Sequence, residues 1–194
     1  MSLSTLLQNI ADAEQGPKTC AVFDFDGTII SGYSATAFLK DQIARGEISP
    51  ADLVQLTQAA TRFGIGSLGF SALMAVHAQY LAGRSEADYV ANSERLFRRA
   101  IAKLIYPEAR QLIEAHRAAG HSIAIISSAT PYQVLPAARD LGIEHVYATD
   151  LQVEDGQFTG GVVQPTCFGI GKVHAAERFT ACLLYTSPSP RDRG

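Results

Sequence analysis

Two aspartates stand one residue apart near the start of the chain, at the end of an apolar run. The segment reads AVFDFDGTII from Ala21 to Ile30, and its carboxylates are Asp24 and Asp26. Two carboxylates this close make most sense around a cation, and a hard ion such as Mg²⁺ takes oxygen ligands while keeping water and substrate phosphate. Gly27 allows a tight turn whose free N–H groups can bind an anion. An isolated DxD motif is equally typical of a strand end capped by Asx-turns, so it does not decide the function alone.

A serine and a lysine further along the chain extend this set. Ser127 directly follows the apolar run IAII, and Lys172 stands in GIGKV, where glycines open a predicted helix. Taken singly, a strand-end serine is more often a turn residue and such a lysine is more often a solvated charge. In this order, after an acidic pair, they supply a phosphate-binding hydroxyl and a cation for phosphoryl oxygens. The four residues together suit phosphoryl transfer.

The elements that must position these residues alternate between strands and helices. Short apolar runs predict strands at residues 19–24, 123–126 and 144–149. Prolines and glycines mark helices at residues 107–120 and 131–142, the second broken or kinked at Pro136, and a further helix from residue 171 that ends at Cys182. Asp155 and Gly156, between apolar stretches, predict a β-hairpin. The alternation implies a parallel sheet with its active site at the carboxyl ends of the strands.

Residues 34–103 differ in character, because they are rich in alanine and leucine and helically periodic. We read them as an insertion of about four helices. The predicted fold class is therefore α/β, a Rossmann-like parallel sheet core with an inserted all-helical cap. The predicted domains are an N-terminal helix at 1–16, a core at 17–33 and 104–181, a cap at 34–103 and a tail at 182–194.

These motifs resemble those of the haloacid dehalogenase (HAD) superfamily of hydrolases. DFDGT is similar to the family's first motif, IAIIS to the second and GIGK to the third. The helical insertion resembles the C1 cap of phosphoserine-phosphatase-like members (subfamily IB), and the likeness spans roughly residues 19–180. It implies a Mg²⁺-dependent phosphomonoester hydrolase that acts on a small phosphorylated metabolite through an aspartyl-phosphate.

The resemblance also implies roles for individual residues. Asp24 would attack phosphorus and bind Mg²⁺. Asp26 would protonate the leaving oxygen, then activate water, with its main-chain carbonyl on the metal. The residues expected to bind phosphate are Ser127, Lys172, Gly27, Thr28 and Ser128. Tyr33 and Tyr132 are expected to border the substrate beneath the cap, which would close and exclude water.

Two departures concern the substrate. Tyr33 falls at or near the position where phosphoserine phosphatases carry a glutamate for the substrate's amino group, which argues against phosphoserine. Stretches such as SSATPYQV and CFGIGK are more similar to HAD domains fused ahead of glycerophospholipid acyltransferases. An acyltransferase domain following this one in the intact gene product is therefore an alternative.

A third departure concerns the end of the chain. The family's fourth motif, an acidic pair that completes the Mg²⁺ shell, does not follow Lys172, and Asp192 is the only late acid. Residues 182–194 are rich in serine and proline and resemble a translated sequencing adapter, so we expect them to be non-native or disordered. We accordingly expect an incomplete sheet with an exposed edge, weak Mg²⁺ binding and impaired activity in these 194 residues.

Composition and charge argue against several other classes. A net charge of −3 gives no case for nucleic-acid binding, and no apolar run approaches the ~20 residues of a membrane helix. Three cysteines without metal-ligand spacing favour a cytoplasmic location. The remaining alternatives are a receiver-like phospho-acceptor domain, a DxD glycosyltransferase and a non-catalytic fragment. Receivers lack such a helical insertion, and a glycosyltransferase leaves Ser127 and Lys172 unexplained.

Overall fold

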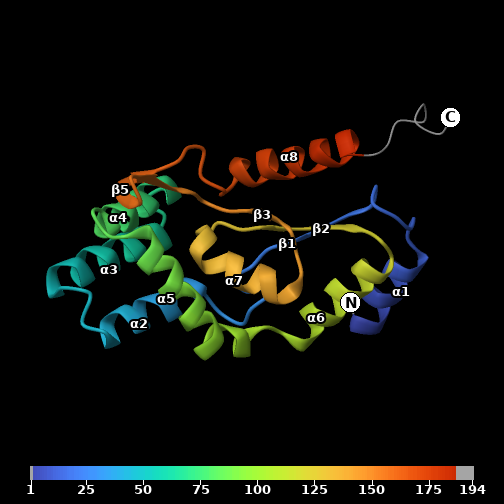
Figure 1. The fold of residues 1–194 in the computed structure, drawn as a ribbon, viewed down its shortest axis with the longest axis horizontal. Coiled ribbons are helices and arrows are strands. Elements are labelled where there is room, and N and C mark those ends of the chain that lie inside the picture. The colour runs from blue at the N-terminus through green and yellow to red at the C-terminus, as the bar shows by residue number, and fades with distance from the viewer. Residues whose placement is uncertain (1, 187–194) are drawn as a thin grey trace.

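A parallel sheet lies at the centre of the computed structural model, which describes residues 2–186, with side chains to residue 183 (Figure 1). Its strands are β1 (Cys20–Phe23), β2 (Ser122–Ile126) and β3 (His145–Tyr147). They pair in the order β1-β2-β3, both pairs parallel, with Phe23 opposite Ile125 and Ile126 opposite Tyr147. The carboxyl ends of all three strands therefore meet at one edge. The predicted α/β class with a parallel sheet is confirmed.

Helices cover both faces of this sheet. The core helices are α1 (Leu3–Asp12), α6 (Pro107–Ala118), α7 (Pro131–Leu141) and α8 (Ile170–Thr186). Alternate residues of β2 point to opposite faces. Ile123 and Ile125 belong to the apolar cluster that includes residues of α6 and α7, whereas Ile126 packs with Ala175 of α8. Figure 1 accordingly shows α8 on one side of the sheet and α7 on the other.

Four α-helices and a short 3₁₀ helix occupy the segment predicted to be the cap. They are α2 (Ser34–Ala44), α3 (Pro50–Gly64), α4 (Phe70–Leu81), α5 (Glu86–Arg99) and η1 (Ile101–Leu104). Ser49 and Ser85 cap α3 and α5, because each hydroxyl accepts from the backbone N–H three residues later. The hairpin of β4 (Leu151–Glu154) and β5 (Gln157–Val162) packs against α4. Gly83 N–H donates to the carbonyl of Phe158 at 2.8 Å.

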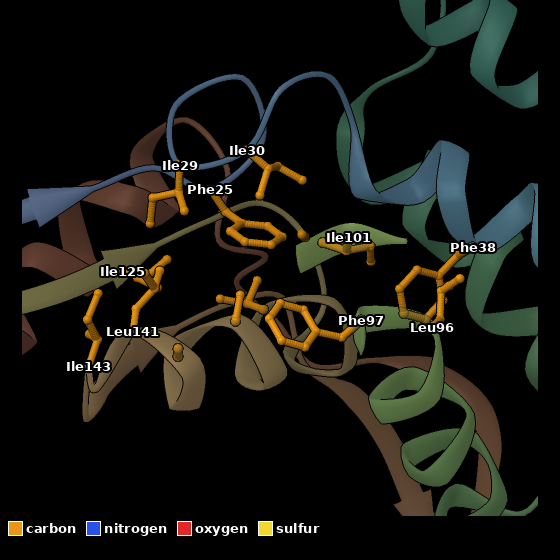
Figure 2. Close-up of a cluster of buried hydrophobic side chains, with 14 of the residues drawn as sticks. Phe25, Ile29, Ile30, Phe38, Leu96, Phe97, Ile101, Ile125, Leu141 and Ile143 are labelled. Atoms are coloured by element: carbon orange, nitrogen blue, oxygen red, sulfur yellow. The ribbon is translucent and has the colours of Figure 1, made fainter. Parts of the chain in front are cut away.

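Apolar side chains of the turn after β1 pack into the hydrophobic core and hold the turn in place. Phe25, Ile29 and Ile30 are fully buried. Figure 2 shows them over Phe97 and Ile101, at the base of the cap, beside β2 and the end of α7. Because these side chains point inward, the intervening polar residues stay at the edge of the sheet. The acidic pair is thus carried on a turn that the hydrophobic core holds in place.

Two predicted helix limits are wrong. Helix α7 is continuous through Pro136, which is buried, and begins with a capping box formed by Thr130 and Gln133. Helix α8 continues beyond Cys182 to Thr186, since the residues from 182 to 184 are Cys-Leu-Leu and the first proline of the tail is at position 188. Residues 182–186 are therefore helical rather than disordered, and the rest of the predicted tail lies outside the described residues. Among the described helices, none is long and apolar enough to cross a membrane.

Candidate active site

Lys172 and Asp24 meet at the carboxyl edge of the sheet. Asp24 directly follows β1, and Lys172 lies in the first turn of α8. The Lys172 Nζ atom is 2.7 Å from Asp24 Oδ2, and the other carboxylate oxygen accepts from the N–H of Phe25 at 2.8 Å. Both side chains keep solvent access, with 42% of Asp24 and 30% of Lys172 exposed. This is a carboxylate that an incoming electrophile can reach, next to a cation that can neutralise added negative charge.

Gly171 lets Lys172 take this position. A Cβ at residue 171 would lie 1.9 Å from the carbonyl oxygen of Thr166, so only glycine fits without moving the backbone. The Thr166 hydroxyl in turn lies 3.2 Å from the hydroxyl of Ser71 on α4. Phe168, which lies between Thr166 and Gly171 in the sequence, stacks on Phe70 with ring centroids 4.5 Å apart. The loop that leads to Lys172 is therefore bound to the cap.

Asp26 lies in a different environment, within a chain of polar groups that crosses from the cap to the core. Its Oδ1 atom accepts from the backbone N–H of Ser34 at 2.7 Å, and Oδ2 accepts from the Ser34 hydroxyl at 3.2 Å. Gln133 Nε2 donates to the same hydroxyl at 3.1 Å, while Gln133 Oε1 accepts from the N–H and hydroxyl of Thr130. Burial raises the pKa of Asp26, and the bonds from Ser34 lower it in part. A carboxyl with this balance is suited to hold a proton and release it.

The remaining predicted phosphate-binding residues are at the same edge of the sheet. Ser127 follows β2, is 1% exposed, and its hydroxyl accepts from the N–H of Ala129 at 3.1 Å. Ser128 next to it is partly buried. Gly27 has φ +74° and donates its N–H to the carbonyl of Gly32, which closes the turn. Thr28 is exposed on that turn.

The two predicted substrate-bordering tyrosines line different surface pockets. Tyr33 precedes α2, is 70% exposed and lines a surface pocket with Lys40 and Arg99. Tyr132 lies in the first turn of α7, where its hydroxyl donates to Glu86 Oε1 on α5 at 2.7 Å. Tyr132 therefore contacts the cap through α5, whereas Gln133 contacts it through Ser34 of α2. Tyr33 and Tyr132 therefore line different pockets, although their chain neighbours Ser34 and Gln133 are hydrogen-bonded.

The donors present fit a magnesium ion in kind. Asp24 offers carboxylate oxygens, and Mg²⁺ commonly binds through one or two carboxylates while retaining waters and substrate phosphate. Both side-chain oxygens of Asp26 accept from Ser34, so this residue has its main-chain carbonyl to offer. Within residues 2–186 no group of three or more His, Cys, Asp and Glu side chains forms a metal-binding cluster.

Comparison with known proteins identifies relatives across most of the chain. Residues 21–189 match the family of haloacid dehalogenase-like hydrolases. A phosphoserine phosphatase of Mycobacterium tuberculosis strain H37Rv is 34% identical over 160 residues, which cover 80% of this chain and 52% of that protein. A probable phosphatase of the same strain is 31% identical over 171 residues, covering 87% of this chain and 59% of the relative. The chain thus spans between half and three fifths of the length of these relatives.

A solved structure supports the fold. A protein of unknown function from Bordetella pertussis Tohama I superposes with a TM-score of 0.78 at 25% identity, covering 86% of this chain and 76% of that one. The shared region is large enough to include both the sheet and helices on either side of it. The family match and this superposition agree on one architecture.

Proposed function

Since this chain belongs to the haloacid dehalogenase-like hydrolases, we propose that it is a phosphatase that transfers the phosphoryl group of a small phosphorylated metabolite to Asp24. The observation that carries the proposal is the contact of Lys172 with Asp24, 2.7 Å long, beside a second carboxyl whose pKa burial raises. Nucleophile, cation and proton donor then stand together at one sheet edge.

The chemistry divides into two steps carried by the chain's own residues. In the first, an Asp24 oxygen forms a bond to phosphorus as the bond to the leaving oxygen breaks, and Asp26 gives its proton to that oxygen. In the second, Asp26 takes a proton from water, whose oxygen bonds to phosphorus as the bond between phosphorus and the Asp24 oxygen of the acyl phosphate breaks, which releases phosphate and restores the Asp24 carboxylate. Lys172 and Ser127 stabilise the phosphoryl oxygens throughout.

The Asp24 carboxylate and the main-chain carbonyl of Asp26 are the groups that would hold a magnesium ion. When bound, Mg²⁺ would neutralise the negative charge of the carboxylate and the phosphate that approaches it. The relatives named as phosphatases support a small phosphomonoester as the substrate class. They support neither a receiver domain nor an appended acyltransferase.

Beryllofluoride and covalent trapping test the proposal without requiring rapid turnover. The full chain is incubated with p-nitrophenyl phosphate and saturating Mg²⁺, quenched, reduced with borohydride and digested for mass spectrometry. We expect the reduced residue at position 24, together with binding of BeF₃⁻ that Asp24→Asn abolishes. Modification at Asp150, which follows β3, would favour the receiver alternative. Full turnover by Asp24→Asn would exclude the aspartyl nucleophile.

A further inference from the structure

A cavity of about 770 Å³ opens between α5, α7 and β4, and its lining includes the predicted substrate-bordering residue Tyr132. On α7 it is lined by residues such as Leu135 and Arg139, whereas Gln133 on another face of the helix bonds to Ser34. Asp24, Asp26, Ser127 and Lys172 are not among its lining residues. Its volume falls within the range typical of small-molecule sites. The cavity is therefore separate from the predicted phosphate position.

Three partly exposed apolar side chains from different segments contribute to the lining of this cavity. Val90 of α5, Leu135 of α7 and Val163 after β5 line it, with 40%, 37% and 43% of each residue exposed. Exposed apolar side chains that converge from separate elements mark contact sites more often than single ones do. An organic ligand with an apolar body would remove all three from water.

The charge of the lining is one-sided. The lining carboxylates are Glu86, Glu94, Asp150 and Glu154, and Arg139 is the lining cation. Arg139 is ion-paired with Glu94, which leaves three carboxylates without a basic partner in the lining. The complement of this surface is a cation with an organic body.

One of the carboxylates is held in place by its neighbours. Glu86 Oε1 accepts the hydroxyl of Tyr132 at 2.7 Å, and the Tyr132 ring packs edge-on against Tyr89 and Phe158 with centroids 5.3 Å away. Because Tyr132 is fixed by these rings, the Glu86 carboxylate is preorganised rather than free to rotate into solvent. Preorganised groups lose less entropy when they bind a partner.

We propose that this cavity binds a small organic cation, with its ammonium or guanidinium group near Glu86, Asp150 and Glu154 and its apolar body on the valine and leucine side chains. The site joins a cap helix to a core helix, so the bound cation would bridge α5 and α7. It stands on its own lining and does not depend on the phosphatase proposal.

Titration of the full ¹⁵N-labelled chain with benzylamine tests the site, with benzyl alcohol as the neutral probe of similar shape. We expect amide shifts centred on α5, the first half of α7 and β4, and weaker binding at high salt because screening reduces the charge attraction. Glu86→Gln and Glu154→Gln should each weaken binding by roughly two- to fivefold, the scale of an exposed ion pair. Glu144→Gln, an exposed acid outside the lining, serves as the matched control.

Each contrary result points to a different error. Equal affinity for benzyl alcohol would reduce the cavity to an apolar groove and overturn the cationic assignment. Equal weakening by Glu144→Gln would show non-specific attraction to an acidic protein. Shifts centred on other elements would place the amine elsewhere. Glu154 is exposed, so its substitution leaves the fold intact even if Glu86→Gln perturbs the bond to Tyr132.

Discussion

Asp24 and Asp26 are two residues apart, yet their surroundings are opposite in kind. Asp24 is 42% exposed and bonded to an ammonium group. Asp26 is partly buried, accepts from the neutral donors of Ser34 at both oxygens, and has its pKa raised by burial. One strand end thus gives Asp24 a direct contact with a cation and gives Asp26 two hydrogen bonds from the neutral donors of Ser34.

The contrast shows how one turn can divide the labour of a reaction. A nucleophile must be ionised and accessible, and a proton donor must hold its proton until the leaving group departs. Four substitutions break or sharpen the contrast in this turn.

Asp24→Asn removes the accessible carboxylate and should have the largest effect. Phosphoryl transfer should fall by about 10⁴-fold or more, the scale on which loss of a nucleophile acts. Single-turnover release of p-nitrophenol measures it, with Asp12→Asn on α1 as the control. Unchanged release would show that the exposed carboxylate is not the attacking group.

Asp26→Asn removes the group that protonates the leaving oxygen, so the loss of rate should depend on how much the leaving group needs a proton. Cleavage of alkyl phosphates should slow by roughly 10²- to 10⁴-fold. The first turnover of p-nitrophenyl phosphate should change little, because its leaving oxygen needs no proton. Equal losses on both substrates, measured in single-turnover experiments, would contradict a role as general acid.

The same substitution has a thermodynamic consequence whose sign follows from the raised pKa. A folded-state pKa above the unfolded value means that Asp26's contribution to stability is present at low pH and lost as pH rises through the folded pKa. Asparagine does not ionise, so Asp26→Asn should gain unfolding free energy relative to the native chain at neutral pH. Denaturant titrations should show this gain disappear in acid, whereas a constant difference would rule out the ionisation.

Gly171→Ala tests the delivery of the lysine to the exposed carboxylate. The added Cβ would meet the Thr166 carbonyl at 1.9 Å, so the start of α8 must move. We expect a loss of about 1–3 kcal/mol in unfolding free energy and, because Lys172 moves with it, up to roughly 10²-fold in transfer rate. Gly64→Ala, where an added Cβ meets nothing within 4 Å, should leave both unchanged or slightly raise stability.

Ser34→Ala tests the hydrogen bond from the Ser34 hydroxyl to Asp26 and should have the smallest effect on rate. It removes the hydroxyl bond that lowers the pKa of Asp26, so that pKa should rise further. The basic limb of the pH–rate profile for an alkyl phosphate should then shift to higher pH. Loss of a partner for the Gln133 amide should cost about 1–3 kcal/mol. Ser67→Ala, at an exposed hydroxyl, is the control. If the basic limb of the pH–rate profile does not move in Ser34→Ala, the Ser34 hydroxyl does not tune the pKa of Asp26.

The sequence predicts the parts of the site that depend on strand ends. Asp24 and Ser127 each follow an apolar run, and parallel strands bring their carboxyl ends together, so their neighbourhood follows from pattern and topology. Lys172 was found from glycines that open a helix. Its contact with Asp24, 148 positions away, depends on how α8 crosses the sheet. The sheet class followed from the strand–helix alternation in the same way.

Other features depend on side-chain directions that no local pattern carries. Gln133 stands 99 positions from Ser34, and the motif signals gave no reason to pair them. The exposure of Tyr33 follows from its place before α2, and Tyr132 faces Glu86 because of how α7 is rotated. Helix α8 extends beyond its predicted end at Cys182, because the residues from 182 to 186 include no proline that would end the helix. The sequence pattern of a threonine followed three residues later by a glutamine, Thr130 and Gln133, could have suggested this capping box.

The hydrogen-bond chain from Asp26 through Ser34 and Gln133 to Thr130 also bears on how this protein can change over generations. Each member satisfies a neighbour, so an apolar replacement at one position strands a polar group at the next. Substitutions at Ser34, Gln133 and Thr130 should be strongly epistatic in their effect on stability, because each changes the partner of the next. Residues on the exposed cap surface can be substituted one at a time, whereas a substitution in this hydrogen-bond chain is constrained by the residues that it bonds.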